Sequence, residues 1–513
     1  MHKNSKLDMD KYSRISFTAL GKAIILIAVI FSYTATPAVS QQADTVSVSD
    51  AIGNEKILTL TEAIHVAMAN NSQVKRSLLS LRNADEQVRL AWSEVLPDIS
   101  ALATYTRNLE IPVNFVPAQF FDPEAPSGEL VPLQFGTDNN WQGGLSVSQT
   151  LFRGEAIVGI GSSKVYKAVQ SENLRATAQQ IVTQTRIAYY NVLAAEEQYR
   201  LQKETVDRLQ QNLEENKARQ EAGLIDQYDV LQVQVQLGNQ QPQLTQAKYT
   251  VEQAYRELSV VLGIPLEIDF NVQGNLNAFN VKSQQASEKV NEVLKKVDSM
   301  TPYQYTGPAM PMEQATDMRG DIRVLEKQNA LKNREIKAIK SRFLPTLSAN
   351  YNLNWTASQA GNPVFFGRED SRARSQTLGF TLSLPIFEGF ERSANLSIAQ
   401  IEKKDLEEQR RAAVRSAKNE IQSARESLDQ AIETAPAREK ALELAQEGYD
   451  RARTRLENGL GSQLDVTNAE LQLRQAEANY AQMVSNYLSA KAQYDRAVGI
   501  VPFVDESRPT LND

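Results

Sequence analysis

An internal duplication constrains the fold of this chain more than any other feature of its sequence. Gly223-Leu224 returns as Gly459-Leu460, an offset of 236 residues (459 − 223). Leu262-Gly263 returns as Val498-Gly499 at the same offset, so the spacing between these landmarks has not drifted by one residue. A repeat of this length indicates two copies of one large structural unit, and the function should be read from that unit.

The composition favours long polar helices over a compact enzyme. Of the 513 residues, 42% are hydrophobic but only 7% are aromatic, and the formal net charge is -7. A negatively charged chain without a cluster of basic residues is not expected to bind nucleic acid. Because cysteine is absent, packing or assembly rather than disulfide bonds must provide stability.

The N-terminal segment has the pattern of a secretory signal peptide. Basic residues precede an apolar run at 23–31, and Ala38-Val39-Ser40 offers a small-residue cleavage site. We therefore expect a signal peptide over 1–40 and a linker over 41–57; the alternative is a single N-terminal anchor helix. No later segment approaches the roughly 20 apolar residues that a membrane helix needs, so insertion into a membrane would require a β-barrel.

Two long segments have the 3.5-residue periodicity of a coiled coil. From about 155 to 222 proline is absent and apolar or small residues recur in alternating steps of four and three, and the second half repeats this pattern. Another such seam follows each Gly-Leu pair. The sequence therefore predicts long helix pairs over 155–263 and 390–500 with a left-handed supercoil. An ordinary filamentous coiled coil would explain these residues equally well.

Between the helices, apolar residues recur at every second position. This pattern predicts one β-hairpin at 98–152 and another at 346–387, with loops at about 111–140 and 358–375. A soluble sandwich would alternate in the same way. Strands of about ten residues, and four aromatic residues placed towards the loop ends, favour a membrane barrel with lipid outside and water inside. These aromatic residues are Tyr105, Trp141, Tyr351 and Trp355.

Four strands cannot close a barrel, and open strand edges are not tolerated in hydrocarbon, so several chains must contribute. Two chains would give eight strands around a filled interior, whereas three would give twelve and leave a lumen. Pro97 and Pro345 are expected to end a helix and start a strand. Gly154 and Gly389 are expected to permit the reverse change. Coiled helices would then lead directly into the barrel.

These features together resemble the family of TolC-type outer membrane efflux proteins. The resemblance covers essentially the whole mature chain, including Leu58-Thr59-Leu60-Thr61-Glu62-Ala63-Ile64 near its start and Met318-Arg319-Gly320-Asp321-Ile322 at the start of the second half. Gly320 stands where the family usually has proline. The Leu-Pro, Phe-x-Gly and Gly-Leu landmarks match as well, and their combination is more specific than any one of them.

The resemblance implies an α+β membrane protein that functions as a homotrimer. Three chains would form a 12-stranded transmembrane β-barrel, with four strands per chain, continuous with a long coiled-coil α-helical periplasmic barrel. Structural repeats are implied at 58–263 and 319–500, an equatorial insertion at 264–318 and a C-terminal tail at 501–513. The protein would lie in outer membrane lipid of a Gram-negative bacterium and extend into the periplasm.

The family's function is that of an exit duct. The resemblance implies a passive channel of a tripartite efflux or type I secretion system, which works with a periplasmic adaptor protein and an inner membrane transporter. No Walker-type glycine loop is present, so the energy must come from that transporter. Neither a catalytic constellation nor a metal or cofactor site is expected. The alternatives are a secreted or periplasmic structural coiled coil and the adaptor itself, which has only one helical hairpin.

The resemblance also points to two groups of functional residues. The helix tips would contact the adaptor, and they contain Arg219, Gly223, Leu224, Arg455, Gly459 and Leu460. Asp465 matches an aspartate of the family's constriction ring, Asn468 stands where a second aspartate is common, and Asp229 is the counterpart of Asp465 in the first half. Converging carboxylates would attract cations. The alternative role for both aspartates is helix capping, since Asp226-x-x-Asp229 and Ser462-x-x-Asp465 are close to the capping-box pattern; the two roles can coexist.

Overall fold

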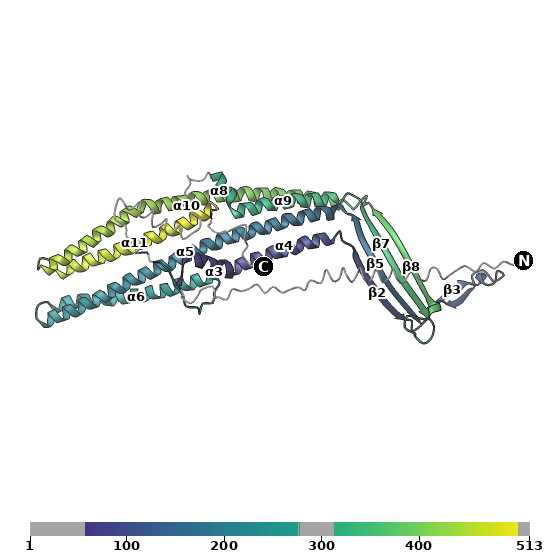
Figure 1. Cartoon of the computed structure of the whole chain (residues 1–513), viewed down its shortest axis with the longest axis horizontal. Helices are drawn as coiled ribbons and strands as arrows, with labels where there is room; N and C mark the ends of the chain where they lie inside the picture. The colour runs from purple at the N-terminus through teal and green to yellow at the C-terminus, as the bar shows by residue number, and fades with distance from the viewer. Residues whose placement is uncertain (1–56, 275, 277–311, 501–513) are drawn as a thin grey trace, which may run out of the picture. The chain divides into compact units, whose positions relative to one another are not determined.

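The computed structural model describes residues 57–274, 276 and 312–500. The expected signal peptide, the linker as far as residue 56, the C-terminal tail, and residues 275 and 277–311 of the expected insertion lie outside the described residues. The elements of the described part form two similar series, one in each half of the chain (Figure 1).

Each series has the order helix, strand, strand, long helix, second helix. The first series consists of β1 (Ile57–Leu58), α3 (Leu60–Asn70), α4 (Ser72–Ser93), β2 (Asp98–Arg107), β3 (Val113–Pro117), the 3-10 helix η2 (Ala118–Phe120), β4 (Leu130–Gln134), β5 (Asn139–Phe152), α5 (Gly154–Glu221) and α6 (Gln227–Leu262). The second consists of β6 (Asn271–Val272), α8 (Met312–Met318), α9 (Gly320–Ser341), β7 (Thr346–Gln359), the 3-10 helix η5 (Glu369–Ser371), β8 (Arg372–Ser383), α10 (Glu391–Glu457) and α11 (Gln463–Ala497).

The two hairpins join into one antiparallel sheet with the strand order β2-β5-β7-β8. The strands β5 and β7, one from each half, lie at its centre and pair from Asn139↔Gln359 to Phe152↔Leu347. The edge strands β2 and β8 each have one neighbour among the described strands. The sheet thus confirms the four strands predicted from the period-two pattern, and its edges remain open.

Two details of the sheet region differ from the sequence-based expectation. Tyr351 pairs with Val147 and Leu378 in the half of β7 nearer the helices, so the prediction that it lies towards the loop end was wrong. The rings of Tyr105 and Trp141 do lie there, 5.1 Å apart. The expected first loop also contains strands of its own, β3 and β4, which pair antiparallel. That pairing was missed because proline interrupts the alternation in both strands.

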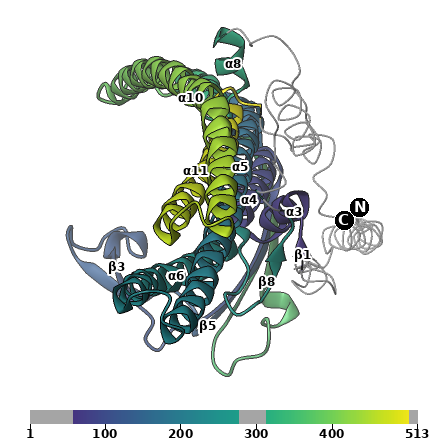
Figure 2. The same ribbon diagram turned by 90° about the vertical axis from the view of Figure 1, so that its left-hand side faces the viewer.

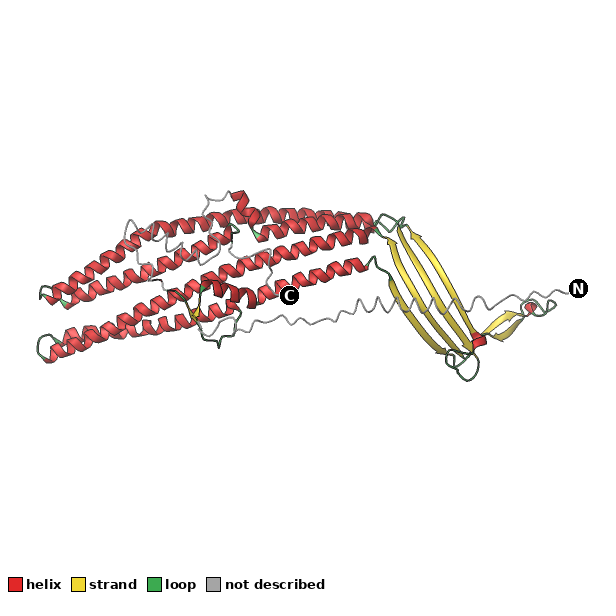
Figure 3. Cartoon of the chain, viewed as in Figure 1, coloured by secondary structure: helices red, strands yellow, loops and turns green. Residues whose placement is uncertain are grey.

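The helices pack around α5. This helix contacts α3, α4, α6, α9 and α11, whereas α10 packs against α8, α9 and α11. Figure 2 views these helices from their far end. Both long helices begin next to the sheet, as Figure 3 shows by colour, and each turns back at its other end to form a helical hairpin. None of the helices in 57–274 and 312–500 combines the length and apolarity needed to cross a membrane.

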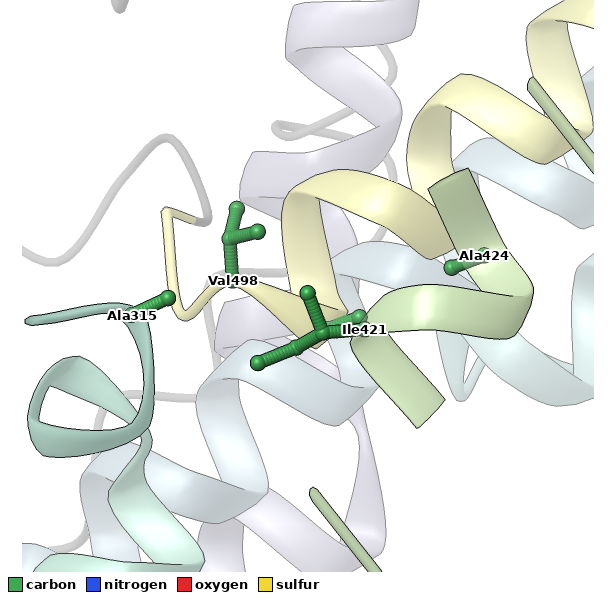
Figure 4. Close-up of a cluster of buried hydrophobic side chains, with 5 residues drawn as sticks. Ala315, Ile421, Ala424 and Val498 are labelled. Atoms are coloured by element: carbon green, nitrogen blue, oxygen red, sulfur yellow. The ribbon is translucent and has the colours of Figure 1, made fainter. Parts of the chain in front are cut away.

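A small apolar core packs α8, at the start of the second half, against α10 and the end of α11. Ala315 of α8, Ile421 and Ala424 of α10, and Ala497 and Val498 at the end of α11 pack together, and none of them is more than 8% exposed (Figure 4). Each of these residues is small or β-branched, and none is aromatic. The backbones can therefore approach closely, but little apolar area is buried per layer. The seams of apolar or small residues predicted from the sequence have this character.

Candidate channel wall, constriction and helix tips

The two faces of the four-stranded sheet differ in chemistry. On one face the central strands bring Leu145 opposite Leu353 and Val147 opposite Tyr351. On the other face the hydroxyl group of Ser146 donates to Oδ1 of Asn352 at 3.0 Å, and asparagines flank this pair along β7 at 350 and 354. A sheet of this kind can separate an apolar surrounding from water.

The expected transition residues lie where helices and strands join. Pro97 and Pro345 lie in the short connections from α4 to β2 and from α9 to β7. Gly389 has a φ of 57° and precedes α10, so the turn itself requires glycine. Gly154 is the first residue of α5, where a Cβ atom would lie 2.9 Å from Cβ of Ser341. Close packing, not a turn, therefore explains this second glycine.

The two helix tips have the same backbone geometry. Gly223 and Gly459 follow α5 and α10 in the left-handed conformation, with φ of 74° and 72°. At each tip the next leucine donates its amide to the carbonyl of an arginine five residues earlier, which is the Schellman arrangement. The bonds are Leu224 N to Arg219 O at 2.9 Å and Leu460 N to Arg455 O at 2.8 Å. The leucine side chains are 73% and 72% exposed, so each tip offers an apolar and a basic side chain to a partner.

Asp465 forms the capping box that the sequence pattern suggested. Its carboxylate accepts from the amide of Ser462 at 3.0 Å, and its own amide donates to Oγ of Ser462 at 3.2 Å. Hydrogen bonding of the backbone amide and the side chain of Ser462 to the carboxylate, with a smaller contribution from the charge of Arg455, holds the pKa of the Asp465 carboxyl below its ordinary value. The carboxylate is fully exposed and negative at neutral pH, so capping leaves its charge available to ions.

The corresponding residues of the first half differ. At the start of α6 the carboxylate of Asp226 accepts from the amide of Tyr228 at 2.8 Å, so Asp226 is the capping residue and Asp229 is an exposed residue of the first turn. Asn468 is exposed on α11, one turn after Asp465. Asp465 and Asn468 therefore lie on one hairpin and Asp229 on the other.

A ladder of ion pairs between α5 and α11 was missed in the sequence. Arg208 Nε lies 2.9 Å from Glu470 Oε1, and Arg474 Nη1 lies 3.3 Å from Glu204 Oε2. We call this set the α5–α11 ladder, and it comprises Glu197, Arg200, Glu204, Arg208, Glu470, Arg474 and Glu477. The signal that could have found it is a stripe of charges at helical spacing in each helix. The ladder joins one helical hairpin to the other.

Two buried arginines were also missed. Arg186 of α5 is 2% exposed and pairs with Asp495 of α11 at 2.8 Å. Arg319 precedes α9 and contacts Asp321 at 2.8 Å and Glu420 of α10 at 2.7 Å. Asp321 is only two residues from Arg319, but Asp495 and Glu420 come from distant parts of the chain. These two distant pairs fix the packing of the helices relative to one another.

Comparisons with known proteins agree with this architecture. The family model "Outer membrane efflux protein" matches residues 63–264 and 312–500. The chain is 21% identical to outer membrane protein TolC of Escherichia coli over 86% of its own length and 82% of TolC. It is 23% identical to the alkaline protease secretion protein AprF of Pseudomonas aeruginosa over 70% of each chain.

Solved structures have the same fold. The CmeC outer membrane channel of Campylobacter jejuni matches with a TM-score of 0.64 and 19% identity, covering 86% of this chain and 85% of CmeC. The transmembrane channel CusC matches with a TM-score of 0.64 and 18% identity, covering 86% of this chain and 92% of CusC.

Long helices that lead into an open antiparallel sheet with one apolar and one polar face define a channel protein. The chain belongs to the outer membrane efflux protein family. It is an efflux or secretion channel of the outer membrane that extends into the periplasm, and it is a transport protein rather than an enzyme. The family and function expected from the sequence are confirmed.

Proposed function

We propose that three copies of this chain form a passive exit duct for small molecules or proteins, working with a periplasmic adaptor protein and an inner membrane transporter. The observation that carries this proposal is the two-faced sheet with its open edges β2 and β8. Peptide groups at a strand edge cannot remain unpaired in hydrocarbon. Pairing β2 of one copy with β8 of the next would satisfy both edges, and three copies would give a barrel wide enough for a lumen.

The helices support the same assembly. The α10 helix leaves large apolar side chains uncovered, among them Ile398 at 52% and Ile401 at 64% exposure. An exported helix that exposes such residues needs a further surface to cover them. We assign this role to the neighbouring copy, with the two repeats (58–263 and 319–500) lining one third of a periplasmic tunnel and the insertion (264–318) surrounding it.

The helix tips are the proposed docking site for the adaptor. The exposed Leu224 and Leu460 lie on equivalent Schellman turns, with Arg219 and Arg455 in the last helical turn before each of them. A partner with matching apolar pockets and acidic groups would therefore find two similar sites per copy.

The start of α11 is the proposed constriction. Three ionised Asp465 carboxylates that converge on the trimer axis would select for cations, while Asn468, one turn further along, adds no charge. Asp229 would contribute negative charge from the first hairpin. Because the capping box holds Asp465 in its ionised form, the two roles of this residue are compatible.

Chemical crosslinking and planar-bilayer recording test the assembly. Crosslinking of the purified protein should stop at three chains, and the same material should conduct ions through single channels. A ladder that ends at two chains, or recovery of the protein in the soluble periplasmic fraction, would contradict the proposal and favour a periplasmic coiled coil or an adaptor.

Asp465→Asn tests the constriction. The substitution removes the charge while retaining an oxygen that can accept from Ser462, so the single channels should lose cation selectivity with little change in thermal stability. Asn468→Ala on the same helix is the matched control and should leave selectivity unchanged. Unaltered selectivity of Asp465→Asn together with lower stability would mean that Asp465 only caps α11.

A further inference from the structure

The segment between β2 and β5 has charge of one sign only. Residues 108–138 contain no lysine or arginine, and their acidic residues are Glu110, Asp122, Glu124, Glu129 and Asp138. Part of the segment folds into the β3–β4 pair with η2 at its turn. We call residues 108–138 the acidic hairpin. None of its carboxylates forms an ion pair within the part of the chain that the structure describes.

The acidic hairpin is not packed on its own sheet. Its strands β3 and β4 pair only with each other, and β3 lies on the opposite side of β5 from β8 (Figure 2). Hydrogen bonds hold its base: the amide of Gly361 donates to Oδ2 of Asp138 at 2.7 Å, and the hydroxyl of Thr137 donates to Oδ1 of Asn140 at 2.9 Å. Large apolar side chains stay uncovered, with Leu109 94%, Phe115 65% and Phe120 81% exposed. A surface of this kind needs a partner.

The other edge of the sheet has the complementary charge. Arg368, Arg372 and Arg374 lie at the loop end of β8, all exposed, and we call them the β8 rim. Nε and Nη2 of Arg372 donate to the carbonyls of residues 366 and 367 at 2.9 and 3.0 Å. None of the three pairs with a carboxylate among the described residues. Glu369 and Asp370 in the same turn leave a net positive charge, and Phe365 beside them is 89% exposed.

We infer that the acidic hairpin of one copy lies on the β8 rim of the next copy. This inference rests on the proposed trimer, in which edge β2 meets edge β8 of a neighbour. The acidic hairpin leaves β2 at its loop end, after Arg107, and the rim opens β8 at the same end. Closing the ring therefore brings carboxylates that form no ion pair within their own copy, together with exposed aromatic side chains, to guanidinium groups that also form none and to an exposed phenylalanine.

The charge pattern favours a second copy over a lipid surface. Anionic headgroups would repel a segment that has five carboxylates and no basic residue. The rim of the same copy is at the opposite edge of the sheet. A neighbouring copy supplies both the basic groups and the apolar cover, and segregation of opposite charges to the two edges also fixes which edges meet.

Cysteine crosslinking tests the contact directly, because the native chain has no cysteine. Glu124→Cys and Arg368→Cys, combined in one chain and treated with a short bis-maleimide, should give covalent dimers and trimers on denaturing gels. Each single variant should remain monomeric. Covalent dimers from Glu124→Cys alone would mean that the acidic hairpins meet one another, and an internal crosslink confined to one chain would mean that the hairpin folds back; either result overturns the inference.

A charge exchange provides a second measurement that needs no crosslinker. Glu124→Arg should lower the temperature at which the trimer dissociates at low salt, Arg368→Glu alone should lower it as well, and the two changes together should restore it. High salt should shrink the difference. If native gels show a trimer but there are no crosslinks and no rescue, the inference is wrong and the proposed function stands. If no trimer forms at all, the proposed function is wrong as well.

Discussion

The helices α5 and α10 are repeat counterparts of 68 and 67 residues, yet they are buried to very different extents. In α5, 23 residues are buried, and in α10 only six. The difference follows from their neighbours, since α5 lies among five other described helices and α10 contacts three, at the side of the bundle. The same 3.5-residue periodicity therefore occurs both in a central helix and in a helix with one side uncovered in the single copy.

The polar residues differ between the helices in the same way. Arg186 of α5 is buried in an ion pair, and its counterpart 236 residues later, Gln422, is exposed. Glu477 of α11 belongs to the ladder against α5, and its counterpart in α6 is Gln241. Buried ion pairs are thus concentrated where α5 meets α11, whereas α10 contributes to buried charge mainly through Arg392 and through Glu420 beside Arg319. Substitutions should reveal this asymmetry.

The largest effect is expected for Arg186→Met. Removing the guanidinium breaks a buried ion pair and leaves the largely buried Asp495 carboxylate with Lys491 at 2.9 Å as its remaining cation, so the loss should be near the lower end of about 3–5 kcal/mol. Gln422→Met at the counterpart position should change stability by no more than about 0.5 kcal/mol. Denaturant unfolding of the detergent-solubilised protein measures both. Equal losses at the two positions would show that α10 is as well covered as α5 in the assembled protein.

Leu201→Ala should have the next largest effect. Leu201 of α5 is 2% exposed, and truncation of a buried leucine costs about 2–5 kcal/mol. Leu444 of α10 is 55% exposed within one copy, so in the protein dissociated to single chains Leu444→Ala should be within about 0.5 kcal/mol of the wild type. The same unfolding measurement compares them. A large loss for Leu444→Ala would locate a covering surface at this level of α10.

The two helix tips should lose similar amounts of stability on substitution, whereas α5 and α10 should not. Gly223→Ala and Gly459→Ala place a Cβ in open space but in the left-handed conformation, at a cost of about 1–2 kcal/mol each. Gly448→Ala, in the interior of α10 with no atom within 4 Å of its new Cβ, should instead stabilise by about 0.5–1 kcal/mol. Unequal losses at the two tips, read from thermal unfolding, would mean that the tips are packed differently.

The smallest effect concerns pH. The ladder has four carboxylates and three guanidinium groups, and burial raises the pKa of Glu477 from 4.5 to about 7. The folded protein therefore binds a proton that the unfolded chain has lost, so this contribution to stability is complete below pH 4.5 and is lost as the pH rises to about 7.

Glu477→Gln should abolish that decrease and leave stability flatter across the interval. Thermal unfolding at several pH values measures the slope, and Glu443→Gln, at an exposed pair with Lys440 on α10, is the control. Retention of the slope in Glu477→Gln would assign it to another group.

Much of the fold could be predicted from local pattern. Steps of three and four between apolar residues predicted the long helices, and alternation predicted the four strands, because both depend only on which face of an element is covered. Tyr351 was misplaced because strand ends are uncertain by a few residues. The β3–β4 pair was missed because its prolines hide the alternation.

The candidate site was less predictable. The Schellman turns at Gly223 and Gly459 have a local sequence signal, a glycine followed by a leucine at the end of a helical pattern. Arg186 has none, because a buried arginine is recognised by the carboxylate that meets it, and Asp495 is 309 residues away from Arg186. Arg319 stands in a family motif together with Asp321, but its contact with Glu420, 101 residues further on, has no local signature. Gly154 was expected at a turn, but its reason, the approach of Ser341, depends on tertiary packing.

The open edges of the sheet have a genetic consequence. A subunit inserted into the bilayer by itself would carry two rows of peptide groups with nothing to bond, at several kcal/mol for each group. Insertion and association should then be a single step whose yield depends on how many subunits are present. An allele that spoils only one edge would block the chains beside it too, and so should be dominant when it is expressed together with the wild type.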